Sequence, residues 1–186
     1  MRIISGIKKG KKLLIPDPSI TRPLKDNVKE NIFNVLIHSK NFKIDFSNTK
    51  VIDLFSGSGS FGIECLSRGA KKVKFYEKNP LASNVLYRNL SNNFDKKKYE
   101  IIKKDFFTIE KGNIFKENPN IIFIDPPYKI EKFQEIINFI NNLSIIKNLI
   151  IIFHVEKTRI IYFDNFIYNE ERIYGLSKII FLKTNS

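Results

Sequence analysis

The chain has 186 residues, of which 42% are hydrophobic and 27% are charged, a composition typical of one globular domain. It carries 32 lysines and arginines against 19 aspartates and glutamates, and the net charge of +13 favours a polyanionic partner over an acidic binding protein. The single cysteine excludes an intrachain disulfide, and with only two histidines we expect no metal site. The chain shows no signal-peptide pattern, and its longest apolar run is far too short to span a bilayer. We therefore expect a cytoplasmic protein that inserts into no membrane.

The first 48 residues differ from the rest and form a predicted basic N-terminal extension. Residues 1–50 hold eleven cations and four acids, so they account for +7 of the +13. A basic, irregular or β-like start leads into a proline-containing stretch and then a helix predicted over Asp26 to Ile37, which Asp26 or Asn27 would cap. The predicted apolar face of this helix contains Val28, Ile32, Val35 and Leu36. The predicted RNA-binding cations are Arg2, Lys8, Lys9, Lys11, Lys12 and Arg22, followed by Lys25 and Lys29.

Residues 49–186 alternate between short apolar runs and longer amphipathic ones. The apolar runs predict strands at 51–55, 72–76, 99–102, 121–124 and 149–153, and helices are predicted at about 60–68, 80–93 and 131–143. Such alternation is typical of an α/β domain with a parallel sheet and right-handed crossovers. The last two β-rich runs, Asn165 to Ile173 and Ser177 to Leu182, flank a glycine and predict an antiparallel hairpin.

A glycine-rich loop follows the first strand of this domain. Residues 57–62 read Gly-Ser-Gly-Ser-Phe-Gly and open a predicted helix, which is the pattern of a turn that brings backbone N–H groups close to a ligand. Glu77 ends the next predicted strand, where its carboxylate could accept both hydroxyls of an adenosine ribose. The cofactor could be NAD or S-adenosylmethionine. Asp53 places a negative charge beside the loop, which suits a cationic ammonium and sulfonium better than a pyrophosphate.

The tetrapeptide Asp125-Pro126-Pro127-Tyr128 ends the fourth predicted strand, at the edge where open α/β sheets bind ligands. Neither proline has an N–H, so the Asp125 side chain and the Pro126 carbonyl offer only acceptors, and Tyr128 adds an aromatic face. An exocyclic amino group of a nucleobase requires two acceptors and a stacking ring. Holding both hydrogens would localise the nitrogen lone pair for attack on a methyl group, with Asp125 or solvent taking the released proton.

These motifs, in this order, resemble those of class I S-adenosylmethionine-dependent amino-methyltransferases. The N-terminal residues are similar, more narrowly, to the signature of the bacterial 16S ribosomal RNA guanine-N2 methyltransferase D family, as is Tyr174-Gly175 before the last strand. That N-terminal resemblance rests on residues 2–6, 10–13, 22–23 and 33–34 and on Asp26, Val28 and Glu30. It implies a Rossmann-like fold with a mostly parallel seven-stranded sheet. It also implies methylation of N2 of one guanine in 16S rRNA, within the small ribosomal subunit or its assembly intermediate.

The resemblance also assigns roles to residues. Asp53, Gly57 and Gly59 would line the methionine part of the cofactor, Glu77 the ribose, and Asp105 and Phe106 the adenine, with Phe55 and Lys78 completing the cofactor site. The predicted catalytic residues are Asp125, Pro126 and Tyr128, and Pro127 and Tyr128 would contact the substrate. His38 and His154 are interpreted as structural, although the position of His154 at the end of the fifth strand is compatible with a place in the cleft.

Two other functions fit much of this pattern. Asp-Pro-Pro-Tyr also occurs in adenine-N6 methyltransferases that act on DNA or RNA, so the target base rests on the N-terminal signature. A non-catalytic RNA-binding assembly factor could retain the same fold. An NAD-dependent dehydrogenase fits least, because the sequence supplies no acid/base pair for hydride transfer and would leave residues 125–128 unexplained. We expect a monomeric enzyme, since the chain is one small domain.

Overall fold

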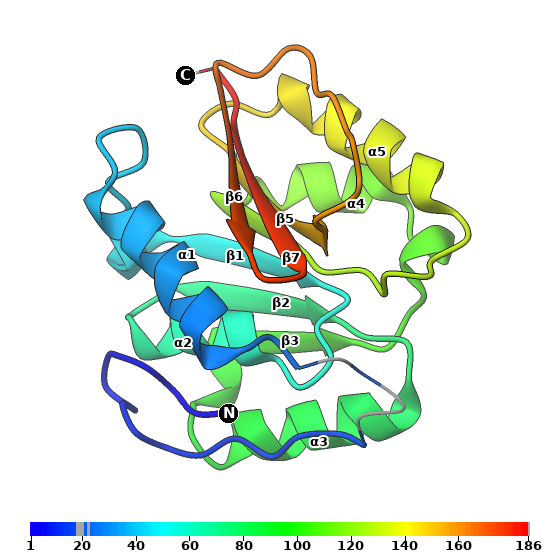
Figure 1. The fold of residues 1–186 in the computed structure, drawn as a ribbon. Helices are drawn as coiled ribbons and strands as arrows, with labels where there is room; N and C mark the ends of the chain where they lie inside the picture. Colours follow the sequence, from blue (N-terminus) through cyan, green and yellow to red (C-terminus); the bar gives the residue numbers. More distant parts are fainter. Residues whose placement is uncertain (18–20, 22, 186) are drawn as a thin grey trace.

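Seven strands form one sheet in the computed structural model, which describes residues 1–17, 21 and 23–185 (Figure 1). Their order is β3-β2-β1-β4-β5-β7-β6; β1 to β5 run parallel, and β7 lies antiparallel between β5 and β6. The strands are β1 (Lys50–Leu54), β2 (Lys72–Tyr76), β3 (Tyr99–Ile102), β4 (Ile121–Ile124), β5 (Ile150–Glu156), β6 (Tyr168–Tyr174) and β7 (Ser177–Lys183). The predicted mostly parallel sheet with an antiparallel C-terminal hairpin is confirmed.

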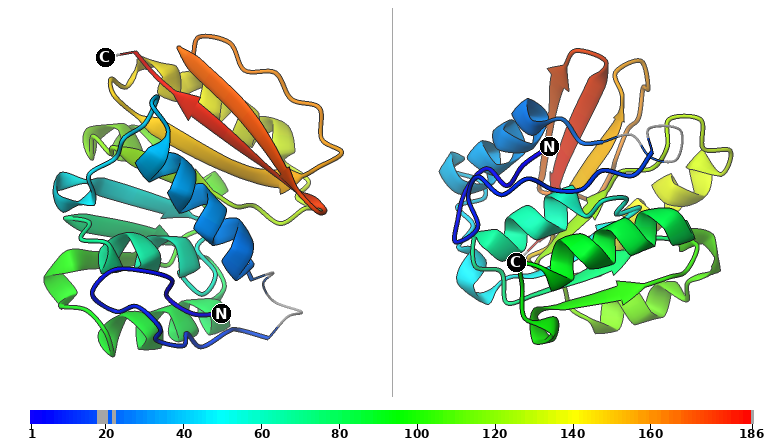
Figure 2. Two further views of the ribbon diagram at one scale, coloured as in Figure 1. Left: turned by 60° about the vertical axis from the view of Figure 1, so that its left-hand side comes forward. Right: turned by 90° about the horizontal axis from the view of Figure 1, so that it is seen from below.

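Helices cover both faces of the sheet (Figure 2). One face carries α1 (Asp26–His38), α2 (Ser60–Ser67) and α3 (Pro80–Ser91), and the other carries α4 (Lys111–Lys116) and α5 (Phe133–Asn142). Short 3-10 helices lie at Phe46–Asn48, Lys96–Lys98, Phe106–Thr108 and Leu143–Ile145. Among the described residues, no helix has the length and apolar character needed to cross a membrane.

The two faces of the sheet build two apolar cores. In β1, Val51 packs with α1, α2 and α3, whereas Ile52 and Leu54 pack with α4 and α5, because successive side chains of a strand point to opposite faces. All four residues of β4 are buried, as expected for a parallel strand with helices on both sides. This double burial is why the central strands read as continuous apolar runs in the sequence.

Helix α1 follows the predicted apolar face but not the predicted cap. Its four predicted core residues are all buried. The N-cap position belongs to Lys25, and no side chain caps the helix, so the assignment of Asp26 or Asn27 was wrong. The carboxylate of Asp26 instead accepts the Arg2 N–H at 3.3 Å and lies 3.6 Å from the ammonium of Lys29. A long-range partner thus replaces the local capping bond.

Helix α4 was not predicted from the sequence. It has six residues, includes Gly112 and fully buries only Ile114, so it offers no apolar periodicity to recognise. The other α-helices begin and end within two residues of their predicted bounds, whereas β5 continues to Glu156, past its predicted end. The helices that shape the site, α2 and α3, start where the sequence predicts.

The N-terminal loop, residues 1–14, lies along α2 and α3 (Figure 2). Its two halves pair through an antiparallel bridge between Arg2 and Lys12 and a bond of 2.9 Å from the Ile3 N–H to the Lys11 carbonyl. The side chains of Ile3 and Leu13 are buried in the same core as the first strand. The predicted extension therefore contributes to the packing of the sheet face that α2 and α3 cover.

Buried polar side chains hold this loop. Glu64 of α2 accepts the N–H groups of Ile4 at 2.7 Å and Ser5 at 2.9 Å, and its carboxylate also accepts the Nε of Arg68 at 2.8 Å. Asn89 of α3 accepts the Leu14 N–H at 2.9 Å and donates to the Leu14 carbonyl at 3.0 Å. These bonds satisfy backbone groups that a loop on the core would otherwise leave unpaired.

Candidate functional site

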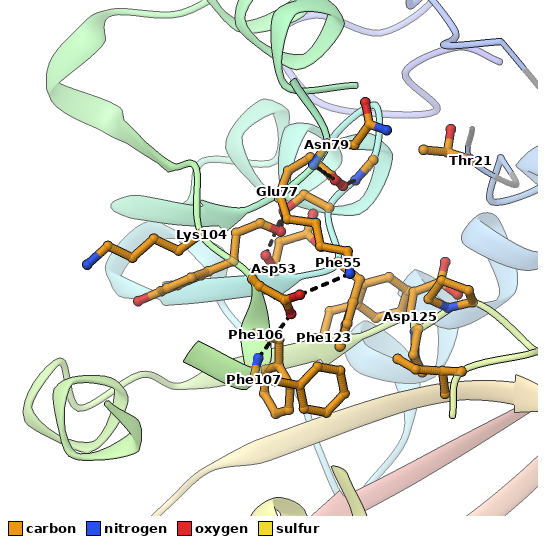
Figure 3. Close-up of a pocket in the computed structure, with 18 of the residues that line it drawn as sticks. Thr21, Asp53, Phe55, Glu77, Asn79, Lys104, Phe106, Phe107, Phe123 and Asp125 are labelled. Carbon is orange, nitrogen blue, oxygen red and sulfur yellow. Dashed lines mark hydrogen bonds and ion pairs between the residues drawn. The ribbon is translucent and has the colours of Figure 1, made fainter. Parts of the chain in front are cut away.

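A cavity of about 890 Å³ opens at the carboxyl ends of β1, β2 and β4 (Figure 3). Its walls come from those strand ends, from the residues after β3 and from Thr21 and Leu24. Of the predicted site residues, Asp53, Phe55, Gly57, Glu77, Lys78, Asp105, Phe106, Asp125, Pro126, Pro127 and Tyr128 line it. Gly59 and the predicted RNA-binding cations do not line it, and Arg22 lies outside the described residues. The structure thus brings every predicted catalytic residue, and every predicted cofactor residue except Gly59, into one cavity.

The glycine loop is a tight, left-handed turn between β1 and α2. Phe55, Gly57 and Gly59 have φ values of +60°, +55° and +80°, and the Gly59 N–H donates to the Ser56 carbonyl at 2.7 Å. Gly62 serves another purpose, since a Cβ there would stand 2.3 Å from the Phe75 ring of β2. The first two glycines therefore shape the turn, and the third lets α2 pack closely on the sheet.

Glu77, at the end of β2, ties the glycine loop to the turn before α3. One carboxylate oxygen accepts the Gly57 N–H at 2.7 Å and the other accepts the Asn79 N–H at 2.8 Å. The residue is buried, yet it lines the cavity. Because an ionised carboxylate has about four lone-pair positions, these two bonds leave acceptor capacity for hydroxyl groups of a ligand. Its placement fits the ribose role assigned by resemblance.

Asp53 makes the floor of the cavity acidic. Its carboxylate is buried and accepts the Gly62 N–H at 2.9 Å. Burial raises the pKa of Asp53 well above its ordinary value; the bond from Gly62 opposes the rise, and the negative charges of Asp125 and Glu77 add to it. A bound cation would offset this clustering of acids. The cavity is therefore electrostatically suited to a positively charged ligand.

The far wall of the cavity combines an aromatic surface with an ion pair. Phe106 is buried and packs its ring 5.2 Å from that of Phe55. Next to it, the Asp105 carboxylate accepts hydrogen bonds from the Lys78 ammonium at 3.0 Å and from the Phe107 N–H at 3.1 Å. Partial burial works to raise the pKa of Asp105, but these two bonds outweigh it and hold the pKa below its ordinary value. An apolar face beside a fixed carboxylate suits a planar base with an amino group.

The residues after β4 form the mouth of the cavity. Asp125 is mostly buried, Pro126 is buried and Tyr128 is half-buried. The Tyr128 hydroxyl lies 3.1 Å from the Ser177 hydroxyl, and the Arg159 guanidinium donates to the Tyr128 carbonyl at 3.1 Å. Contacts from the C-terminal part of the chain therefore hold the loop that presents the two predicted acceptors.

His154, which the sequence analysis interpreted as structural, contacts two of the predicted catalytic residues. Its Nδ1 lies 2.9 Å from the Asp125 carboxylate, and its ring meets the Tyr128 ring edge-on, with 6.1 Å between centroids. The sequence signal was its place at the carboxyl end of a strand, the edge where α/β sheets bind ligands. What the sequence lacked was the adjacency of β4 and β5, which brings this imidazole onto Asp125.

The N-terminal loop that carries Arg2, Lys8, Lys9, Lys11 and Lys12 lies along α2, and none of these five cations lines the cavity. The Lys8 N–H bonds to the Ser67 hydroxyl at the end of α2, the end opposite the glycine loop. The Arg2 carbonyl lies near the start of α2, because it accepts the Lys29 ammonium at 2.7 Å and the same ammonium donates to Ser60 at 3.1 Å. The lysine-rich loop thus follows the helix from the rim of the cavity to its far end.

Lys29 itself is not available to RNA. Its side chain is completely buried, and burial lowers its pKa, with Glu64 and Asp26 opposing the shift. The expectation that it extends the phosphate-binding surface was wrong. A buried lysine with three close oxygen partners instead joins the N-terminal loop, α1 and α2. No group of three or more potential metal ligands occurs among the described residues.

The sheet order, the glycine loop and the acidic cavity define a class I methyltransferase. A family model described as "Conserved hypothetical protein 95" matches residues 1–183. "Ribosomal RNA small subunit methyltransferase D" of Haemophilus influenzae is 31% identical over 86% of this chain and 80% of its own length. "Putative rRNA methyltransferase YlbH" of Bacillus subtilis is 33% identical over 79% and 77%, respectively. The chain belongs to this family, and its similarity to ribosomal RNA small subunit methyltransferase D confirms the predicted membership.

Solved structures agree on the fold. A putative methyltransferase of Escherichia coli, yhhF, superimposes with a TM-score of 0.75 at 24% identity, over 100% of this chain and 98% of its own. The Thermus protein TTHA0928 superimposes with a TM-score of 0.78 at 18% identity, over 100% and 99%. These likenesses cover residues 1–48 as well as the methyltransferase sheet.

Proposed function

We propose that this chain transfers one methyl group to the exocyclic N2 amino group of a guanine in small-subunit ribosomal RNA. The observation that carries the proposal is the Asp125-Pro126-Pro127-Tyr128 loop at the mouth of an acidic cavity, in a member of a family whose named relatives methylate ribosomal RNA. The family supports rRNA as the substrate class. The N-terminal signature found in the sequence supports guanine N2 over adenine N6.

S-adenosylmethionine is the methyl donor of this class, and the cavity fits it. When bound, it supplies an electrophilic methyl group on a positively charged sulfur. Asp53 and the glycine loop would hold its cationic amino-acid part, Glu77 its ribose hydroxyls, and Phe106 with Asp105 its adenine. Burial and the neighbouring Asp125 and Glu77 raise the pKa of Asp53, and a cation bound beside it would stabilise its charged form.

The residues at the mouth of the cavity would prepare the amino group. The Asp125 carboxylate and the Pro126 carbonyl accept its two hydrogens, and Tyr128 stacks on the base. These contacts orient the nitrogen lone pair, so that catalysis comes from position and from acceptors that stabilise the positive charge developing on nitrogen. The proton released afterwards passes to Asp125 or to water. No covalent enzyme intermediate is required.

The lysines of the N-terminal loop would bind RNA phosphates near the cavity. Lys9, Lys11 and Lys12 are exposed, and the loop is fixed on α2 by backbone bonds rather than by the lysines themselves. Their ammonium groups are therefore available for phosphates without loss of the fold. A target base extruded from the RNA would enter the cavity past Tyr128.

The test is methyl transfer to undermethylated small subunits, with labelled S-adenosylmethionine and identification of the modified nucleoside. We expect N2-methylguanosine; N6-methyladenosine would overturn the base assignment. Tight cofactor binding without transfer would favour the assembly-factor alternative. Asp125→Ala should lower the transfer rate by about 10²-fold or more while cofactor affinity stays within a few fold. Asp164→Ala is the matched control, since Asp164 is exposed and does not line the cavity.

A further inference from the structure

We propose that His154 is a positioning residue that orients the Asp125 carboxylate for the amino group of the substrate. This inference rests on the proposed function and adds to it a residue outside the predicted catalytic set. The imidazole would act through Asp125 and would not touch the reacting atoms.

The sheet register brings the two residues together. Strand β5 pairs in parallel with β4, and Ile124 lies opposite Phe153. Asp125 and His154 come directly after this pair and therefore lie side by side where β4 ends. The distance from the His154 Nδ1 to the Asp125 Oδ1 is 2.9 Å. The pairing of the two strands therefore fixes this contact, unlike an ion pair between two mobile surface side chains.

The His154 ring has little freedom to leave this position. Its side chain is 3% exposed, and its backbone is anchored in β5, because the neighbouring Phe153 and Val155 side chains are buried on the opposite face of the sheet. A buried imidazole nitrogen that loses its partner also loses hydrogen bonding that water cannot replace. The bond to Asp125 is therefore held by the packing of β5 as well as by its own strength.

A bond to one carboxylate oxygen fixes the plane of the whole group. With Nδ1 as the donor, the Asp125 carboxylate cannot rotate freely, while a carboxylate in general retains acceptor capacity for further donors. The same ring also lies edge-on to Tyr128, whose hydroxyl contacts Ser177. One imidazole thus sets both the acceptor and the aromatic face that a target base would meet.

Two variants separate hydrogen bonding from ring packing. His154→Phe keeps a ring and removes the donor, whereas His154→Asn keeps an N–H donor near the position of Nδ1 and removes the ring. In single-turnover transfer at saturating RNA and cofactor, we expect His154→Phe to be about 10- to 100-fold slower, because small misplacement of a reacting group has effects of this size. His154→Asn should recover most of the rate, and cofactor affinity should change little in either.

The control is His38→Phe, at the exposed histidine that ends α1. It should leave the single-turnover rate unchanged. A wild-type rate in His154→Phe, or a loss in His154→Asn equal to that in His154→Phe, would overturn the inference, because neither result is compatible with a donor to Asp125. Thermal unfolding of each folded variant shows whether a rate change merely follows a loss of structure.

A second measurement does not depend on activity. The chain has two histidines, so nitrogen-15 labelling of histidine gives two imidazole patterns in NMR spectra. We expect His154 to carry a proton on Nδ1, and we expect Asp125→Ala to change its pattern while that of His38 stays the same. An unprotonated Nδ1 on His154 would overturn the inference even if wild-type protein transferred methyl groups. Absence of transfer by wild-type protein with the expected NMR pattern would contradict the proposed function alone.

Discussion

Two buried glutamates, in different regions of the molecule, each hold a loop by accepting hydrogen bonds from its backbone. Glu64 holds the N-terminal loop by accepting two consecutive backbone N–H groups, and Glu77 holds the glycine loop by accepting two others. Glu64 also pairs with the Arg68 guanidinium, whereas Glu77 lines the open cavity beside Asp53. The first site is electrostatically complete within the chain. The second concentrates negative charge, and in the proposed function a cationic ligand would complete it.

We expect the largest loss of folding stability from a substitution at Glu64, whose partners all lie within the chain. Glu64→Ala removes the acceptor of two loop N–H groups and leaves the mostly buried Arg68 without this carboxylate. We expect a loss of about 3–5 kcal/mol in the free energy of unfolding, measured in urea, because removal of one partner strands the other in a buried position. Glu30→Ala, at an exposed glutamate of α1, is the control. Equal stability of the two variants would refute this account of the loop.

A change at Glu77 should affect cofactor affinity more than the free energy of unfolding. In Glu77→Ala, the N–H groups of Gly57 and Asn79 lose their acceptor, and water in the cavity can accept part of these hydrogen bonds. We expect cofactor affinity to fall by about 10- to 100-fold, the size of one or two charge-assisted hydrogen bonds, as measured by calorimetry. Its loss of folding stability should be smaller than that of Glu64→Ala. A reversed order of the two stability losses would contradict the comparison.

Asp53→Asn tests the cost of keeping the cavity acidic. Because burial raises the pKa of Asp53, its folded state binds a proton more tightly than its unfolded state, and its contribution to stability is lost as pH rises through the folded pKa. The asparagine oxygen can still accept the Gly62 N–H. We expect the free variant to be more stable than wild type by about 1 kcal/mol at pH 7, with the gap closing toward pH 4.

The same variant should bind the cationic cofactor more weakly. A variant that is no more stable at neutral pH would show that the site stores no unfavourable charge. Denaturant unfolding at a series of pH values, with and without cofactor, measures both effects on one protein.

The smallest effect per residue is expected on the N-terminal loop surface. Changing Lys9, Lys11 and Lys12 to glutamate should weaken RNA binding and flatten its dependence on salt, by about 0.7–0.9 in the logarithmic slope for each phosphate that a lysine no longer neutralises. The matched control changes Lys96, Lys97 and Lys98, an exposed run with the same charge at a 3-10 helix. An equal change in slope for both triple variants would mean that only net charge matters.

Much of the fold was predictable because short sequence patterns, such as apolar runs and glycine-containing turns, determine its elements. Central strands such as β4 are apolar at every position since helices cover both of their faces, and the turn at Gly175 marks the C-terminal hairpin. The glycine loop and residues 125–128 follow directly after strands, so their meeting at one edge of a parallel sheet was also predictable. The family membership and the fold class were correct for this reason.

What the sequence did not reveal depends on contacts between distant residues. Glu64 and Asn89 lie within helices and read as ordinary polar positions, yet both are buried under a loop 59 to 75 residues away. Lys29 reads as one more cation in a basic extension, although it is completely buried. His154 reads as structural until the register of β4 and β5 is known. In each case, the partner that defines the role belongs to another element.

The N-terminal loop has a consequence for how the chain matures during its synthesis. The partners of residues 4, 5 and 14 lie at residues 64 and 89, so this segment leaves the ribosome well before the helices that receive it. Docking requires closure of a loop of that length, and folding slows as such sequence separations grow. Until then a strongly cationic stretch remains undocked beside a polyanionic particle. Its earliest contacts as a nascent chain are therefore expected to be electrostatic, and its buried backbone bonds to form late.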